Sequence, residues 1–130
     1  MTGIDNRLEQ KIGFDRIRRI ISDKCSTTYA AGRTATETFS AKPSQIRKRL
    51  LLTDEMRLIM MFEDGFPSSG FIDCIDFLKP LENSSSAIDI ISLRKLKTML
   101  DTLRRVTAFF EDVKDGVYPN LKRMSASIMG

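Results

Sequence analysis

Apolar side chains recur three and four residues apart through the longest uninterrupted segment of the chain. The series consists of Leu93, Leu96, Met99, Leu100, Leu103, Val106 and Phe110. This spacing places the side chains on one face of an α-helix, which has about 3.6 residues per turn. Asp89 stands where an N-cap is needed. We therefore predict a helix over Ile90–Glu111 that packs this stripe into the core, with Leu100 near its centre.

Shorter segments repeat the same helical pattern. Gly13 separates a first helix over Asp5–Ile12 from a second one, whose apolar residues are Phe14, Ile17, Ile20 and Ile21. Residues 25–28 supply cap residues for a short helix that ends near Phe39. Gly32 lies inside that helix, where a glycine costs about 1 kcal/mol against alanine. A close approach of two helices would explain it.

Proline and serine then mark a stop and a restart. Pro43 ends one segment and Ser44 is the expected N-cap of a helix from Gln45 to about Glu63. On a helical projection Ile46, Leu50, Leu51, Leu58, Met61 and Phe62 share one broad side, while Leu52, Met56 and Ile59 lie off it. A helix that is apolar on more than one side is either sandwiched in a core, which we expect here, or buried at an interface.

The remaining segments complete an all-α pattern. A loop over residues 65–70 precedes a short apolar segment over Phe71–Leu81, and a last segment carries Leu121, Met124 and Ile128. The period-two alternation of strands is absent, and a chain of 130 residues is the length of one domain. We predict a single helical domain over residues 1–130, built as an irregular bundle of about five helices.

Charge gives one candidate binding surface. The net charge is +4, which is compatible with a polyanionic partner and also common in proteins without one. Arg94, Lys97, Arg104 and Arg105 lie opposite the apolar stripe and are the candidate nucleic-acid contacts. The alternative is a solvated helix face. Because Asp101 and Asp112 share this face and dilute its field, we expect weak binding of duplex DNA or none.

Catalytic chemistry is missing from the sequence. There is no histidine, no phosphate-binding P-loop and no nucleophile elbow, so we assign no catalytic, cofactor-binding or metal-binding residue. Three adjacent carboxylate pairs, which include Asp54 with Glu55, are expected on solvated helix faces. Cys25 and Cys74 are interpreted as small core residues of a protein in a reducing compartment. Without a signal peptide or an apolar run of bilayer length, we expect a cytoplasmic protein with no membrane partner.

A series of short motifs, in order along the chain, resembles a known family. The series is Gly13-Phe14-Asp15-Arg16-Ile17, Cys25-Ser26-Thr27 with Gly32, Thr53-Asp54-Glu55-Met56-Arg57, Phe66-Pro67, Asp73 with Leu78, Leu100-Asp101-Thr102 and Tyr118-Pro119-Asn120-Leu121. Together they resemble the N-terminal region of the second MutS lineage of bacteria, the MutS-like endonucleases that end in an Smr nuclease domain.

The resemblance implies that the chain is the N-terminal fragment of a much larger protein. It implies the start of a core and lever region, followed by a clamp, an ATPase that uses ATP and Mg²⁺, and a nuclease. The parent would be a homodimer that binds DNA in DNA mismatch repair-like processes or suppresses recombination. This segment would be a non-catalytic module that contacts the clamp and ATPase domains. The alternative from the residues is a free-standing helical adaptor that binds a protein partner through its long helices.

Overall fold

Six helices and no strand make up the part of the chain that the structure describes, residues 7, 10, 12–37, 42–83 and 87–129 of a computed structural model. The helices are α2 (Phe14–Lys24), α3 (Thr28–Thr36), α4 (Pro43–Phe62), α5 (Ile75–Asn83), α6 (Ile90–Asp112) and α7 (Pro119–Met129). The all-α prediction is therefore confirmed. The expected helix over Asp5–Ile12 lies mostly outside the described residues. Within this range, Arg7 and Gln10 are described and are helical.

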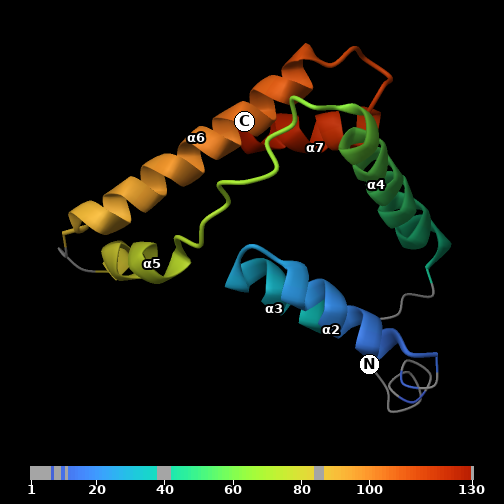
Figure 1. The fold of residues 1–130 in the computed structure, drawn as a ribbon, viewed down its shortest axis with the longest axis horizontal. Coiled ribbons are helices and arrows are strands. Elements are labelled where there is room, and N and C mark those ends of the chain that lie inside the picture. The colour runs from blue at the N-terminus through green and yellow to red at the C-terminus, as the bar shows by residue number, and fades with distance from the viewer. Residues whose placement is uncertain (1–6, 8–9, 11, 38–41, 84–86, 130) are drawn as a thin grey trace.

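The helices α2 and α3 form an antiparallel hairpin, drawn in blue and teal in Figure 1. Thr27 caps α3 by accepting a hydrogen bond from the backbone of Ala30 at 3.1 Å. The Ser22 hydroxyl donates to the Ala31 carbonyl across the hairpin at 3.3 Å. The explanation offered for Gly32 is wrong, because this glycine is exposed and no atom lies within 4 Å of the position a Cβ would take.

A carboxylate from a distant segment holds the start of α3. Asp73 lies in the strap, which we define as residues 63–74 between α4 and α5. One of its oxygens accepts hydrogen bonds from the backbone N–H of Thr28 at 2.7 Å, from the Thr28 hydroxyl, and from the backbone N–H of Tyr29 at 3.3 Å. The Thr28 hydroxyl is the main reason that the pKa of Asp73 lies below its ordinary value. The hairpin is thus joined to the strap by a negative charge at a helix N-terminus.

The hydrophobic core lies where the C-terminal parts of α4 and α6 meet the start of α7. Ile59, Phe110 and Tyr118 are buried there, and Leu58, Phe66, Val106, Phe109, Val113 and Leu121 pack around them. Phe66 of the strap stands edge-on to Phe109 and Phe110, with ring centroids 5.1 and 6.0 Å apart. The core is therefore small and confined to one corner of the molecule.

A second carboxylate clasp joins α4 to α7. Tyr118 is the residue before α7, and its phenol donates to Glu63 instead of capping the helix. Glu55 of α4 supplies the missing acceptor and receives the backbone N–H of Asn120 at 2.9 Å and of Leu121 at 3.1 Å. The Asn120 side-chain amide adds a third bond at 2.7 Å. Glu55 is only 7% exposed, so the expectation of a solvated face is wrong for this carboxylate.

The apolar side of α4 is mostly uncovered, which contradicts the prediction of a sandwiched helix. Ile46, Leu50, Leu51, Met60, Met61 and Phe62 are all exposed, whereas Ile59, which the projection placed off the broad side, is fully buried. The reason is that α4 contacts α7 through the side that carries Glu55 and Ile59. The helix also begins two residues earlier than predicted, with Lys42 as its N-cap instead of Ser44 and Pro43 in its first turn.

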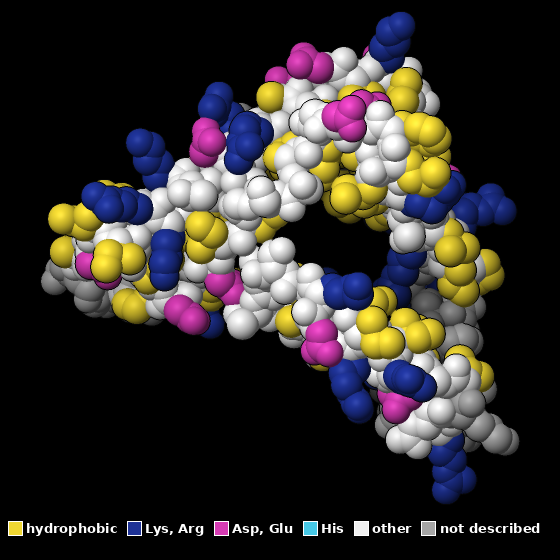
Figure 2. All heavy atoms as spheres, viewed as in Figure 1, with side chains coloured by type: hydrophobic (Ala, Val, Ile, Leu, Met, Phe, Trp, Pro, Cys, Tyr) yellow, Lys and Arg dark blue, Asp and Glu magenta, His cyan; other side chains and the backbone are white. Residues whose placement is uncertain are grey.

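The molecule has an open arrangement. Its accessible surface is 10244 Å², whereas a compact monomer of 14.8 kDa exposes about 7000 Å². Figure 2 shows an opening between the α2–α3 hairpin and the helices above it, with hydrophobic side chains at the surface over α4 and α2. The accessible surface of the chain therefore exceeds that of a compact monomer by about 3000 Å².

Candidate interaction surface

The four predicted nucleic-acid contacts lie on the exposed side of α6, but they do not form one cluster. Arg94 and Lys97 border a shallow depression of about 400 Å³ together with Thr98 and Asp101. Arg105 instead borders a larger depression of about 880 Å³ between the strap and the end of α6. The basic charge is therefore divided between two sides of the helix.

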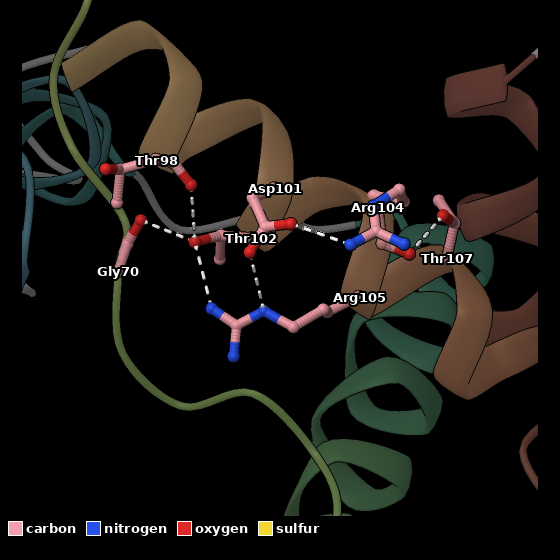
Figure 3. A network of polar contacts seen from close by, with 7 residues as sticks. All are labelled: Gly70, Thr98, Asp101, Thr102, Arg104, Arg105 and Thr107. Atoms are coloured by element: carbon pink, nitrogen blue, oxygen red, sulfur yellow. Dashed lines mark hydrogen bonds and ion pairs between the residues drawn. The ribbon is translucent and has the colours of Figure 1, made fainter. Parts of the chain in front are cut away.

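Asp101 neutralises part of that charge. Its carboxylate accepts a hydrogen bond from Arg104 at 2.8 Å and lies 3.4 Å from the Arg105 guanidinium, so that it stands between the two arginines (Figure 3). The hydrogen bond from Arg104 is the main cause that lowers the pKa of Asp101. Asp101 and Arg105 are four residues apart, a spacing at which side chains on a helix surface form ion pairs. Two of the four candidate cations thus already have an anionic neighbour.

Gly70 fixes how the strap crosses α6. The Thr102 hydroxyl donates toward the carbonyls of Gly70 and Thr98, at 2.8 and 2.9 Å, and Arg105 approaches the same oxygen at 3.5 Å (Figure 3). Gly70 has φ +87°, and a Cβ there would lie 2.5 Å from the Thr102 hydroxyl. Both the backbone angle and the close approach require glycine. This contact buries Thr102 completely and decides which side of α6 faces the strap.

The buried side of α6 is not centred on the predicted apolar stripe. Thr102, Thr107 and Phe110 are its buried residues, while Leu93 is 51% and Leu100 is 56% exposed. The prediction that Leu100, near the centre of the stripe, packs into the core is therefore wrong. Threonine can be buried here because its hydroxyl donates to a carbonyl of its own helix, as Thr107 does to Arg104 at 2.8 Å. An apolar stripe in the sequence does not reveal this rotation.

An uncovered groove results on the flank of α6. It has a volume of about 520 Å³ and is lined by Leu93, Leu96, Lys97, Leu100, Asp101 and Arg104. We call this set the leucine groove. Sequence reasoning missed it because the leucines were assigned to the core and the cations to a separate face. The signal that was available is the repeat of seven, since Leu93 and Leu100 recur at the same interval as Lys97 and Arg104.

The large depression between the strap and α6 combines apolar rings with opposite charges. Phe66 and Phe109 line it, together with Asp64, Asp112 and Arg105. Within the described ranges, no three His, Cys, Asp or Glu side chains are grouped so that they could hold a metal ion. Cys74 is buried in the strap, and burial raises the pKa of its thiol, which fits the prediction of a core residue.

Comparisons with protein-family models, with curated proteins and with solved structures found no match to the chain. None of the described helices combines the length and the apolar character that crossing a lipid bilayer requires.

Proposed function

We propose that the chain is a non-catalytic helical module at the N-terminal end of a MutS-like DNA-processing ATPase. Its support is the order of the family-like motifs along the sequence, from Gly13-Phe14-Asp15 to Tyr118-Pro119-Asn120-Leu121. In this role the helices contact clamp and ATPase domains and transmit nucleotide-driven movement between them. ATP, Mg²⁺ and the nuclease belong to the rest of that homodimeric parent, which binds DNA in repair or in the suppression of recombination.

The observation that carries a module role is the open arrangement. An isolated domain of this size buries roughly two thirds of its unfolded surface, but here the helices leave about 3000 Å² more exposed than a compact monomer would. Many large apolar side chains are among the exposed residues, as expected for a segment that packs against further protein. The two carboxylate clasps, Glu55 on α7 and Asp73 on α3, hold separate helices in position without a large core.

The reading frame tests this proposal. Translation past Gly130 into a P-loop motif is expected, and a stop codon directly after Gly130 would overturn it. In the longer protein, Glu55→Ala is expected to leave ATP binding intact while it abolishes the stimulation of ATP hydrolysis by DNA. Asp54→Ala is the matched control, because the Asp54 carboxylate is exposed and pairs with Arg57 in the same turn of α4. Equal stimulation in both variants would contradict a coupling role.

A second candidate function is a helical adaptor, and the exposed apolar side of α4 favours it. Met61 and Phe62 are 61% and 69% exposed at the end of that helix. An adaptor would bind its partner through this side without any ATPase in the same chain. The test uses a chain that ends at Gly130 and a defined partner protein. Binding of that partner by the parent chain, and loss of the binding in Met61→Ser with Phe62→Ser, would support the adaptor over the module.

A further inference from the structure

The leucine groove has the shape and spacing of one half of a helix–helix interface. Leu93, Leu96 and Leu100 follow one another at three and four residues, which is the spacing of the seam in paired helices. Leu93 and Leu100 are more than half exposed, and Leu96 forms the half-buried floor between them. An extended peptide would present side chains at a period of two and would not match this seam.

The described part of the chain leaves this flank uncovered because α6 packs through its other side. Thr102 faces the strap, and Phe110 lies in the core with α7. The groove is therefore not a gap left by imperfect packing of the core. It is a separate face of a long helix whose other side contacts the strap and the core.

The rim of the groove is basic. Lys97 and Arg104 are seven residues apart, in step with Leu93 and Leu100, and so occupy the flanking positions of the same seam. Asp101 is the acidic residue of the rim, and its carboxylate is engaged by Arg104 and Arg105. A partner helix thus meets a row of leucines flanked by two cations, of which Arg104 is already paired with Asp101 and Lys97 carries the remaining positive charge.

Charge separates the conceivable occupants. In an antiparallel pair of α6 helices, Lys97 and Arg104 of one copy would face Arg104 and Lys97 of the other, and like charges in such positions oppose pairing. The net charge of +4 acts in the same direction. A nucleic acid could place phosphates beside the cations, but its charged backbone would then lie against three leucines. No aromatic side chain lines the groove for base stacking.

We propose that the leucine groove binds an amphipathic α-helix of another protein segment. The partner's apolar side chains recur three and four residues apart, and glutamate or aspartate flanks them opposite Lys97 and Arg104. The groove is defined by the packing of α6 alone, so the proposed partner does not depend on the MutS-like assignment.

Two synthetic peptides test the proposal with the 130-residue chain. Each has roughly 21 residues, three heptads, with leucine at the seam positions and either glutamate or lysine at the flanks. Fluorescence anisotropy at about 150 mM salt is expected to give a Kd on the order of micromolar for the glutamate peptide and at least about tenfold weaker binding for the lysine peptide. Failure of the glutamate peptide to bind, or equal binding of both peptides, would overturn the proposal.

Variants locate the binding. Leu93→Ser with Leu100→Ser is expected to raise the Kd for the glutamate peptide by at least about tenfold. Circular dichroism checks that the helices persist in this variant. Leu50→Ser on the exposed side of α4 is the matched control and is expected to change nothing. Lys97→Glu with Arg104→Glu is expected to reverse the preference toward the lysine peptide. Binding that is unchanged by the Leu93 and Leu100 substitutions would overturn the assignment of the site.

Sedimentation and a DNA titration decide against the other occupants. A dimer of the chain that dissociates in Leu93→Ser with Leu100→Ser would show that a second copy fills the groove. The surface would be assigned to nucleic acid if duplex DNA displaces the peptide. In that case DNA binding should be lost in Lys97→Glu and kept in Leu93→Ser with Leu100→Ser. Either result overturns the proposal, whereas a monomer that binds only the acidic helix supports it.

Discussion

Removal of the Glu55 carboxylate is expected to detach α7 from α4. In Glu55→Ala the backbone N–H groups of Asn120 and Leu121 lose their acceptor, and Tyr118, the residue before α7, does not replace it because its phenol donates to Glu63. A buried donor without a partner costs about 1–3 kcal/mol. Because Asn120 and Leu121 are only half-buried and water reaches them in part, we expect a total loss of about 2–4 kcal/mol.

The conservative variant separates charge from shape. Glu55→Gln keeps an oxygen for the two backbone donors but removes the negative charge from the N-terminus of α7, so we expect a loss of about 1–2 kcal/mol. Asp54→Ala is the matched control. Its carboxylate is exposed and paired with Arg57 at 2.7 Å, and such surface pairs contribute about 0–1 kcal/mol.

Urea denaturation measures these differences, and amide hydrogen exchange shows where they arise. The Asn120 and Leu121 amides should exchange faster in Glu55→Ala than in the parent chain, while α2 and α3 stay unchanged. A domain of this size holds about 5–15 kcal/mol in all, so the expected loss is readily resolved. A loss below about 1 kcal/mol in Glu55→Ala, or an equal loss in Asp54→Ala, would refute the assignment of Glu55 as the cap of α7.

Further predictions concern the strap, the hairpin, and the difference between an exposed and a buried apolar residue. Gly70→Ala should destabilise the chain by about 1–3 kcal/mol in urea melts because of its positive φ and the close approach to α6, whereas Gly65→Ala, with open space around it, should change stability by less than about 1 kcal/mol. The hydrogen bonds that lower the pKa of Asp73 stabilise hairpin docking above its ordinary pKa, and this contribution is lost as the pH falls through the lower folded value; the amide signals of α3 should report an acid transition that Asp73→Asn abolishes. Leu100→Ala should cost less than about 1 kcal/mol because the side chain is exposed, and Ile59→Ala about 2–5 kcal/mol because it is fully buried; a reversed order would restore the predicted stripe as the core.

Local features of the helices could be predicted from the sequence. The start of α2 after Gly13, a cap of α3 within residues 25–28 and the cap of α6 by Asp89 agree with the structure, because these signals lie within one or two turns of the helix they begin. The helical periodicity was likewise sufficient for the fold class. The position of Lys97 and Arg104 on the exposed side of α6 followed from the same projection.

Only the tertiary structure decided which side of each helix is buried. The stripe through Leu100 and the broad side of α4 satisfy helical spacing, but Gly70, Thr102 and Glu55 form contacts between residues that lie far apart in the sequence. Gly70 is required by the Thr102 hydroxyl of α6, and Glu55 caps a helix at a residue 65 positions away in the sequence. Neither contact leaves a pattern in the neighbouring residues. Periodicity states that a face is apolar, whereas burial depends on what is brought against that face, and that depends on such long-range contacts.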